Sequence, residues 1–577
     1  MSRLSNYFSL KENEKGEKYL EVFVRGIEVL RLTLSNKGTA FTKEERIALG
    51  LDGLLPPRVT DLDHQVERLY RNYLRLGSDL ERYEFLRDVQ ERIEVAFYAL
   101  LERHLEEMLP IVYTPTVGLA VQQYSSIYKT ARGLTLSPEN IDRVEEVVNN
   151  YPWHEVRMIV ATDSSAILGI GDQGHGGLAI CIGKLALYTA GGGLSPFHTM
   201  PVNLDVGTNR KELLEHPHYL GVHQKRLEGE AYFEFMDKFV EAAERKWPKA
   251  VIQWEDFSKD VAFKVLERYR DKIPCFNDDI QGTGAVVLAG LLCACKQKGE
   301  SLTEQRVVIA GAGAGGIGVA CAILEGMVCE GLNREQARRQ MFVIDGRGLV
   351  LEDLTPDEYK QRVAQPASAV DDWETEKQIP TLMEVVENAK PTVLIGLTGV
   401  TDLFSEPLIR RMARSCERPI IFPLSNPTAH CEAIPEDIFN WTEGRAVVAT
   451  GSPFNDVEYG GKTYPIGQGN NAFIFPGLGF ASVLGKCRRI SDAMVLESAY
   501  ALADYTTEHY HDDGRIFPPI SELQNVSKYV TKRVLEKALE DGSSERTDLS
   551  EKSLEDYIEG YFWNAEYLPF VAGKRGG

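Results

Sequence analysis

Two pairs of adjacent acids stand among apolar and aromatic residues, and paired carboxylates of this kind can bind a metal ion. Glu255 and Asp256 lie in VIQWEDF at the end of a predicted strand, and Asp278 and Asp279 lie in IPCFNDDIQGTG. Carboxylates in a half-buried site repel one another, so a divalent cation or a lysine is the expected partner. Ligands made only of oxygen favour Mg²⁺ or Mn²⁺ over Zn²⁺. The alternative interpretation is that these acids are surface groups or helix caps.

A lysine and a tyrosine are the candidate proton carriers. Lys184 follows a long run with few charges, AILGIGDQGHGGLAICIG, and is the candidate partner of the acids. A single ammonium in such a run is either a base with a shifted pKa or a member of a structural ion pair. Tyr113 stands in IVYTPTVGLA and is either a buried tyrosine packed by a proline turn or a general acid.

A glycine-rich loop predicts a dinucleotide site. The pattern GxGxxG occurs twice, at 169–174 and at 311–316, but only the second follows a predicted strand and precedes an apolar helix. Gly311, Gly313 and Gly316 would allow a tight turn, close approach of a pyrophosphate and close helix packing. The next strand ends in Asp345, which could bind a ribose 2′-hydroxyl.

The residues around that acid favour NAD over NADP. Gly346 follows Asp345 and offers neither a hydroxyl nor a cation to a 2′-phosphate, although Arg347 and Arg362 are close enough in sequence to leave NADP open. A nucleotide-triphosphate loop at 177–185 is rejected, because it is one residue too long and has a leucine where the metal-binding hydroxyl belongs.

The elements that must position these residues alternate between helix and strand. The sequence up to about residue 110 has a helical pattern, most clearly over 61–109. Strands and helices then alternate, and the last hundred residues return to helix and end in a polar tail. The predicted strands are 157–161, 167–170, 250–254, 306–310, 341–344, 392–396 and 419–423. Strands separated by helices predict a multidomain α/β fold with a doubly wound parallel sheet.

Composition excludes several functions. The chain has 577 residues, with 85 acidic against 64 basic side chains and a formal net charge of -21. Such a balance argues against binding to nucleic acid or to an anionic membrane. The longest apolar stretch, 285–295, is too short to span a bilayer, and the N-terminus has no apolar signal core. Nine cysteines without a CxxC pair indicate reduced thiols and a cytoplasmic protein.

Taken together, these segments resemble the malic enzymes, including their close malolactic relatives, along nearly the whole chain. The shared stretches are YTPTVG (113–118), TDxxxILGIGDQG (162–174), GKL (183–185), LDVGTN (204–209), WEDF (254–257), FNDDIQGT (276–283), PLSNPT (423–428), GSPF (451–454) and GQGNN (467–471). Their number, order and spacing identify the chain as a member of that family.

The resemblance implies oxidative decarboxylation of (S)-malate to pyruvate and CO₂ with reduction of NAD⁺. Lys184 resembles the base that takes the hydroxyl proton, and Tyr113 the acid that protonates the enolpyruvate carbon. Asp278 resembles the partner that tunes Lys184. A bound metal would stabilise the enolate that remains after CO₂ leaves.

The family pattern also implies the ligand sets. The metal, Mg²⁺ or Mn²⁺, would be bound by Glu255, Asp256 and Asp279. Asn426 and Asn471 resemble amides that hold the substrate and the nicotinamide.

One segment departs from the family. Many members carry GER before ILG, and its arginine binds a malate carboxylate, but residues 164–166 here are Ser-Ser-Ala. Malolactic enzymes, which release lactate and retain NAD⁺, also lack that arginine, as do some bacterial malic enzymes. A malolactic reaction is therefore the alternative prediction.

By analogy with the family we expect four parts and a homodimer or homotetramer. The parts are a helical N-terminal domain at 1–130 that carries Tyr113, an α/β substrate and metal domain at 131–280 and 470–538, a Rossmann NAD domain at 281–469, and a C-terminal tail at 539–577.

Overall fold

The computed structural model describes residues 4–549 and 553–574. The chain forms two compact units. Unit 1 contains the residues up to Asp256 together with those from Glu555 onward, and unit 2 contains Phe257–Leu554. The finer division into four domains stays a prediction.

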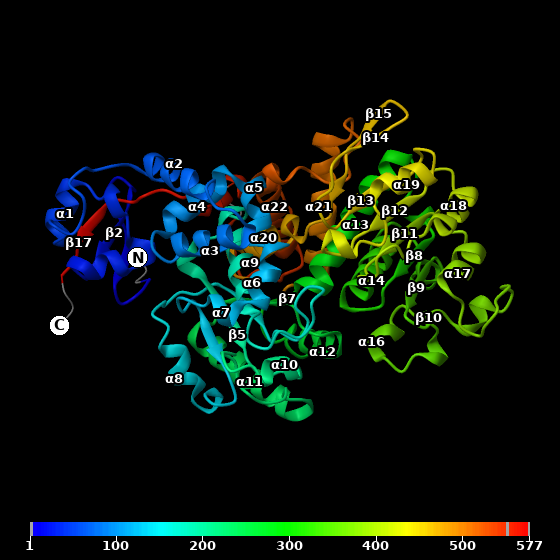
Figure 1. The fold of residues 1–577 in the computed structure, drawn as a ribbon, viewed down its shortest axis with the longest axis horizontal. Helices are drawn as coiled ribbons and strands as arrows, with labels where there is room; N and C mark the ends of the chain where they lie inside the picture. The colour runs from blue at the N-terminus through cyan, green and yellow to red at the C-terminus, as the bar shows by residue number, and fades with distance from the viewer. Residues whose placement is uncertain (1–3, 550–552, 575–577) are drawn as a thin grey trace. The chain divides into compact units, whose positions relative to one another are not determined.

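Unit 1 begins with strands where the sequence pattern predicted only helix. Strands β1 (Phe8–Glu12) and β2 (Lys18–Val22) form an antiparallel hairpin, and β17 (Phe570–Ala572) pairs with β2 in parallel. The two ends of the chain therefore lie side by side in one sheet (Figure 1). Phe8 and Phe570 are buried in the small core under this sheet. The prediction of helix at the start of the chain was wrong, and so was the prediction of only a polar tail at its end. The strands are short, and β17, which completes their sheet, lies at the far end of the chain.

The helices predicted between residues 61 and 109 are confirmed. Those of the N-terminal half of unit 1 are α1 (Lys43–Leu49), α2 (Leu62–Tyr73), α3 (Asp79–Gln90), α4 (Glu94–Arg103), α5 (Leu105–Val112), α6 (Thr116–Gln122), α7 (Tyr124–Ile127) and α8 (Val144–Asn149). Capping boxes start α1 at Thr42 and α3 at Ser78. In each, the side chain of the capping residue accepts from the backbone nitrogen of a glutamate three residues later, and that glutamate accepts from the backbone nitrogen of the capping residue. Helix α4 is buried from Glu94 to Leu101 and packs against α9.

A parallel sheet forms the centre of unit 1. Its strands are β3 (Leu134–Leu136), β4 (Met158–Thr162), β5 (Thr199–Leu204) and β6 (Val251–Trp254), in the order β3-β5-β4-β6. All residues of α9 (Leu178–Ala190) are buried, and α9 packs on β4 and β5. Helices α10 (Lys211–Leu214) and α11 (Gly229–Lys246) precede β6. The predicted strands at 157–161 and 250–254 are confirmed, but residues 167–170 lie in a loop.

Unit 2 contains the predicted doubly wound sheet. Its strands are β8 (Val307–Ala310), β9 (Met341–Asp345), β10 (Gly348–Leu349), β11 (Val393–Gly396), β12 (Ile420–Pro423), β13 (Val447–Thr450) and β16 (Gly467–Gln468). The order is β10-β9-β8-β11-β12-β13-β16, and only the pairing of β10 with β9 is antiparallel. All four predicted strands of this sheet are confirmed.

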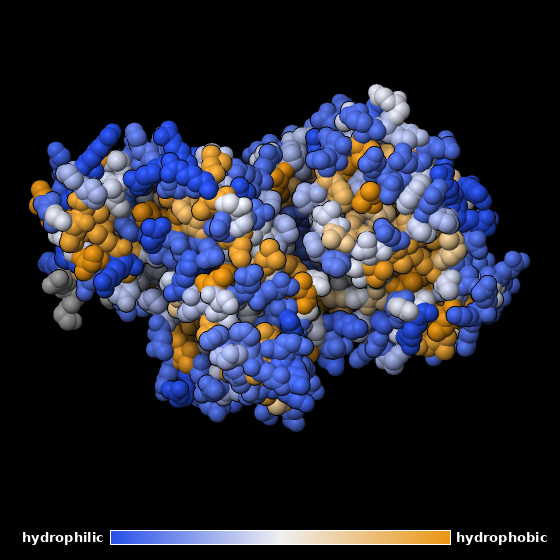
Figure 2. Space-filling view, in the orientation of Figure 1, coloured by the Kyte–Doolittle hydropathy of each residue, from blue (hydrophilic) through white to orange (hydrophobic). Residues whose placement is uncertain are grey.

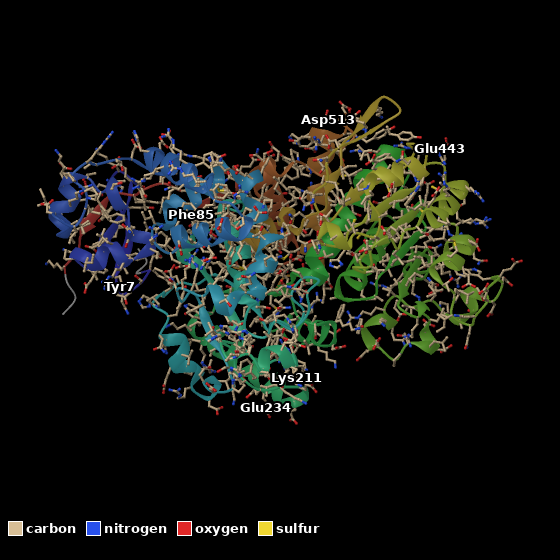
Figure 3. The ribbon with its side chains drawn as sticks, viewed as in Figure 1. Tyr7, Phe85, Lys211, Glu234, Glu443 and Asp513 are labelled. Carbon is tan, nitrogen blue, oxygen red and sulfur yellow. The ribbon has the colours of Figure 1, made fainter. Side chains whose placement is uncertain are left out.

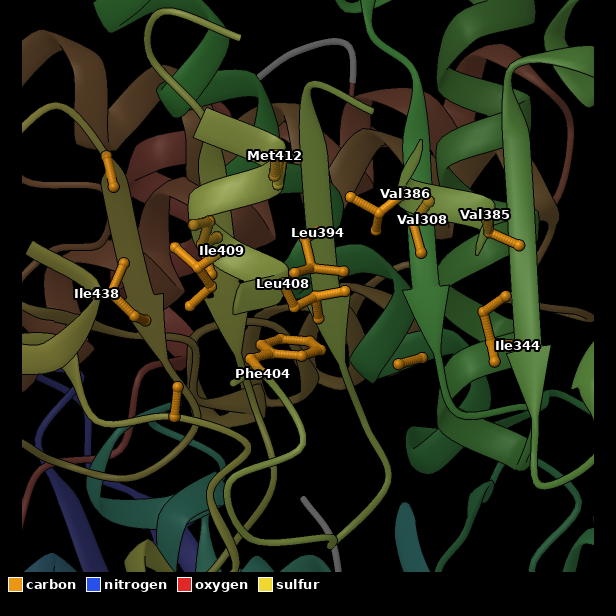
Figure 4. Packing of buried hydrophobic residues seen from close by; sticks show 14 of the residues in the cluster. Val308, Ile344, Val385, Val386, Leu394, Phe404, Leu408, Ile409, Met412 and Ile438 are labelled. Carbon is orange, nitrogen blue, oxygen red and sulfur yellow. The ribbon is translucent and has the colours of Figure 1, made fainter. Parts of the chain in front are cut away.

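Helices cover this sheet and bury its apolar side chains. They are α14 (Ala314–Cys329), α15 (Arg334–Arg339), α16 (Glu358–Gln361), α17 (Leu382–Ala389), α18 (Glu406–Ser415) and α19 (Pro435–Trp441). Val308, Leu394 and Ile421 pack on α17–α19, where Val385 and Leu408 complete the core (Figure 4). A small hairpin, β14 (Val457–Tyr459) and β15 (Lys462–Tyr464), follows β13.

The rest of unit 2 is mainly helical. It includes α12 (Lys259–Tyr269), β7 (Cys275–Asn277), a π-helical turn η6 (Asp278–Gly282), α13 (Thr283–Lys298), α20 (Phe475–Leu484), α21 (Asp492–Tyr510) and α22 (Leu523–Glu540). Helix α23 (Leu554–Tyr561) begins at the last residue of unit 2 and otherwise belongs to unit 1. The continuous helix Asp278–Lys298 is apolar and long enough to cross a membrane by length and composition, but 78% of its apolar window is buried inside the protein. It packs against α14 and α21, as a core helix does.

The surplus of acid appears on the surface. The face in Figure 2 is largely hydrophilic, and the exposed residues labelled in Figure 3 include Glu234, Glu443 and Asp513. Exposed carboxylates such as these contribute to the net negative charge of the chain without forming a metal or ligand site.

Candidate active site

Lys184 has a buried acid as its partner. Its ammonium lies 3.0 Å from Oε1 of Glu255, and both side chains are 1–2% exposed. Glu255 follows β6, and its Oε2 accepts a hydrogen bond of 2.7 Å from Gln253 Nε2. Tyr188, one turn after Lys184 on α9, donates to Gln253 in turn. The acid that pairs with Lys184 here is Glu255, one of the four for which Lys184 was the candidate partner, whereas the role of Asp278 stays a prediction. Gln253 and Tyr188 are supporting residues that were not predicted from the sequence.

Tyr113 lies beside this ion pair. It ends α5, is 6% exposed, and the centre of its ring is 5.2 Å from Lys184 Nζ. Gly183 makes this approach possible, because a Cβ there would lie 2.6 Å from the carbonyl oxygen of Val112 and 3.4 Å from the Tyr113 ring. The GKL motif therefore has a packing reason for its glycine as well as a chemical reason for its lysine.

Asp256 is held in an uncommon backbone conformation. Its φ is +56°, in the left-handed region that a residue with a side chain rarely adopts. Its Oδ1 accepts from the backbone nitrogen of Leu168 at 3.1 Å, and its carbonyl oxygen accepts from that of Ala166 at 3.1 Å. Leu168 also has a positive φ, of +44°. Strained residues gather at functional sites when surrounding contacts fix them, and here the segment that replaces GER is tied to a candidate metal ligand.

A buried arginine from elsewhere in the chain, Arg226, binds both ends of the same loop. Arg226 Nη2 donates to Asp172 at 2.9 Å and to the carbonyl oxygen of Asp163 at 2.8 Å. Burial opposes ionisation of Asp172, but the hydrogen bonds and charge of Arg226 prevail and hold the pKa of Asp172 below its usual range. Arg226 thus joins the two ends of loop 163–172. Ala166 supplies only a methyl group where many family members have a cation.

In unit 2, Asp278 and Asp279 begin the π-helical turn η6. Asn277 caps this turn, because its Oδ1 accepts from the backbone nitrogen of Ile280 at 2.9 Å. Asn471 Nδ2 donates to Asp278 Oδ2 at 3.0 Å. A Cβ at Gly282 would lie 2.0 Å from Asp278 Oδ1, so only glycine leaves room for this carboxylate. The structure brings Asn471 to Asp278, a contact that the sequence did not indicate.

The glycine loop has the predicted strand–turn–helix context. It leaves β8 at Gly311, whose φ is +116°, and Gly313 is the N-cap of α14. A Cβ at Gly311 would lie 2.3 Å from the carbonyl oxygen of Leu397, and one at Gly316 would lie 1.8 Å from that of Gly311. A Cβ at Gly313 would have nothing within 4 Å. Packing alone therefore requires the first and third glycines, and only an approaching ligand would require the second.

Asp345 ends β9 beside this loop. Its Oδ2 accepts from Lys360 Nζ at 2.9 Å and its Oδ1 from the backbone nitrogen of Arg347 at 2.8 Å. Burial opposes its ionisation, but the bond from Lys360 prevails and lowers the pKa of Asp345. Arg362 pairs with Glu267. Arg347 Nη2 also donates to Asp345 Oδ2, at 3.4 Å, but Lys360 is the nearer cation at this acid and was not predicted from the sequence.

Asn426 follows the neighbouring strand β12. Its Oδ1 accepts from Ser452 Oγ at 2.5 Å, and no residue in the described part of the chain accepts from its amide nitrogen. This leaves the amide N–H groups for another partner. The rejected triphosphate loop at 177–185 lies almost wholly inside α9 (Leu178–Ala190), so it is helix rather than a phosphate-binding loop.

Comparisons with known proteins cover nearly the whole chain. Residues 90–270 match the family model described as "Malic enzyme, N-terminal domain", and residues 280–539 match "Malic enzyme, NAD binding domain". A protein named NAD-dependent malic enzyme from Aliivibrio fischeri is 46% identical over 544 residues, which are 94% of this chain and 96% of the relative. One of that name from Proteus mirabilis is 47% identical over 541 residues, 93% and 95% of the two chains.

Solved structures show the same fold. The crystal structure of a malic enzyme from Entamoeba histolytica has a TM-score of 0.56 at 23% identity and covers 89% of this chain and 92% of its own. One from Pyrococcus horikoshii has a TM-score of 0.53 at 23% identity and covers 79% and 88%.

Proposed function

Because the chain belongs to the malic enzyme family, we propose that it catalyses the oxidative decarboxylation of (S)-malate to pyruvate and CO₂ with reduction of NAD⁺. The observation that carries the proposal is the buried Lys184–Glu255 ion pair with Tyr113 beside it. A buried base with an acid beside it suits a reaction that removes a proton from a hydroxyl and later returns one to carbon. The names of the relatives support the same reaction.

Lys184 and Tyr113 divide the two proton transfers. Lys184 Nζ must first release its ammonium proton, and the free amine then takes the proton of the C2 hydroxyl while hydride leaves C2. The phenol of Tyr113 then donates a proton to C3 of the enol that remains after CO₂ departs. Gly183 keeps the two groups close, and Gln253 holds Glu255 in place for Lys184. Asp278, held by Asn471, is the further proposed partner of Lys184.

The acids suit a hard divalent cation. Glu255 and Asp256 are buried and Asp279 is partly buried, and all three offer only carboxylate oxygen, the donor that Mg²⁺ and Mn²⁺ prefer. We therefore propose them as the metal ligands. When bound, the metal would withdraw electrons from the C2 oxygen and NAD⁺ would accept the hydride.

The Rossmann loop suits NAD. Gly311, Gly313 and Gly316 would accept the pyrophosphate at the N-terminus of α14, and the Asp345 carboxylate would accept a hydrogen bond from a ribose hydroxyl. The proposed role of Asn426 and Asn471 is to hold substrate and nicotinamide. We also propose a cytoplasmic homodimer or homotetramer, and we keep the four-part domain division as a proposal.

Product analysis tests this function. Protein, malate, Mn²⁺ and excess NAD⁺ are mixed, and absorbance at 340 nm, pyruvate and lactate are followed together. Equal amounts of NADH and pyruvate are expected. Lactate without NADH would contradict the proposal and support the malolactic alternative, for which Ala166 is the specific observation.

A further inference from the structure

Glu432 is a fully buried acid in the NAD-binding unit. Its exposure is 0%, and it lies between the short 3₁₀ turn η10 (Thr428–His430) and α19. Among the described residues, no cation forms an ion pair with it. A buried carboxylate without hydrogen bonds or a counter-ion is costly, so hydrogen bonds must compensate for its burial.

Four hydrogen bonds to the Glu432 carboxylate compensate for its burial, and their donors lie in two loops, one at Thr398 and one at Ser425. The backbone nitrogen and the Oγ1 of Thr398 both donate to Glu432 Oε1 at 2.8 Å. The backbone nitrogen of Ser425 donates to Oε2 at 3.3 Å, and its Oγ donates to Oε1. Ser425 Oγ itself accepts from the nitrogen of Gly399 at 2.8 Å. Because an ionised carboxylate only accepts, all these bonds have a fixed direction.

These two loops lie where a dinucleotide is expected. Thr398 follows β11 and Ser425 follows β12, which are adjacent parallel strands, and ligands of such sheets bind beyond the carboxyl ends of the strands. Ser425 directly precedes Asn426. The carbonyl oxygen of Glu432 also accepts from the nitrogen of Phe404 at 3.0 Å. One residue therefore holds both ends of the β11–α18 connection and the start of the loop after β12.

The end of β11 is shaped to admit this carboxylate. A Cβ at Gly396 would lie 2.6 Å from Glu432 Cδ, so any larger residue would displace the acid. Gly396 thus leaves space for the Glu432 side chain, and the hydroxyl groups of Thr398 and Ser425 donate to its carboxylate.

We infer that Glu432 is a positioning residue for NAD⁺, which acts by fixing the Thr398 and Ser425 loops and thereby the direction of Asn426. The inference rests on the proposed function, since it takes NAD⁺ to bind at this edge of the sheet. Glu432 touches no ligand in this account. Glutamine has the same shape but would turn an N–H group toward donors, so the two loops would separate.

The test is calorimetric titration of NAD⁺ into the full chain of Glu432→Gln. The Kd is expected to rise about tenfold, the cost of about one unsatisfied buried hydrogen bond. The matched control is Glu436→Gln, which removes an exposed carboxylate on α19 and should leave the Kd unchanged.

Other outcomes are distinguishable. A lower melting temperature with an unchanged Kd would overturn the inference, because it would assign Glu432 a structural role only. If Glu432→Gln does not fold, Ser425→Ala removes one donor and should still raise the Kd; wild-type affinity in Ser425→Ala would contradict the inference. Failure of the wild-type chain to bind NAD⁺ would instead refute the proposed function.

Discussion

Gly313 and Gly316 belong to the same loop but should respond to alanine in opposite ways. A Cβ at Gly316 would lie 1.8 Å from a backbone oxygen, which cannot rotate away, whereas a Cβ at Gly313 would have nothing within 4 Å. Gly316→Ala should therefore destabilise unit 2. Gly313→Ala should leave the ligand-free protein intact.

The magnitudes follow from the packing. Overpacking costs about 1–3 kcal/mol, and the gain of up to about 1 kcal/mol from alanine in a helix offsets only part of it. Gly316→Ala should therefore lower the melting temperature by a few degrees. At Gly313 the backbone φ is −82°, which alanine can adopt. Replacing glycine by alanine at this N-cap position lowers the free energy of unfolding by about 0.5–1 kcal/mol. The lower conformational entropy of the unfolded chain raises it again by about 0.4–1 kcal/mol. The net change there is near zero.

NAD⁺ binding separates the two explanations. In Gly313→Ala the new methyl group occupies the space that the pyrophosphate needs, so the Kd for NAD⁺, measured by calorimetry, should rise at least about tenfold. Wild-type affinity in Gly313→Ala would refute the assignment of this loop to the dinucleotide. A Gly316→Ala protein as stable as wild type would refute the packing argument.

Three further predictions concern the catalytic pocket, the metal and pH. Gly183→Ala should push Val112 and Tyr113 away from Lys184 and lower kcat at least about tenfold, with the Kd for NAD⁺ unchanged; normal kcat in steady-state assays would contradict the role of Gly183. Asp279→Asn should raise the Mn²⁺ concentration for half-maximal activity about 10–100-fold, and EDTA should abolish wild-type turnover; an unchanged Mn²⁺ requirement would remove Asp279 from the ligands. Burial raises the pKa of Glu102 from 4.5 to about 7 against the opposing charge of Arg103. Because the folded state keeps this proton longer than the unfolded state, stability falls as pH rises from about 4.5 to about 7. Glu102→Gln should therefore melt higher than wild type at pH 8 and equally at pH 4, and equal melting at both pH values would be the contrary result.

Features set by local sequence could be predicted well. The apolar strands 306–310, 341–344, 392–396 and 419–423 are each flanked by helix or turn signals, and all four are present. The strand–glycine–helix order around Gly311 also needs only neighbouring residues. An isolated charge in an apolar run left two interpretations for Lys184, a base with a shifted pKa or a member of an ion pair, and the structure shows an ion pair with Glu255.

Features that depend on distant residues could not be predicted. Strand β2 pairs with β17, which is about 550 residues away, and no local pattern shows this. Residues 167–170 are apolar like a strand, but they form a loop in which the backbone nitrogen of Leu168 donates to the Asp256 carboxylate. Lys360 and Glu432 act through partners brought together only by the folded sheet.

The most direct test of the central claim is the rate of NADH formation from malate in Lys184→Met. A methionine fills the same space without a base, and Lys211→Met on exposed α10 (Figure 3) is the control. We predict that Lys184→Met binds NAD⁺ with wild-type affinity and forms NADH at least about 100-fold more slowly, whereas Lys211→Met is fully active. NADH formation at the wild-type rate in Lys184→Met would contradict the account.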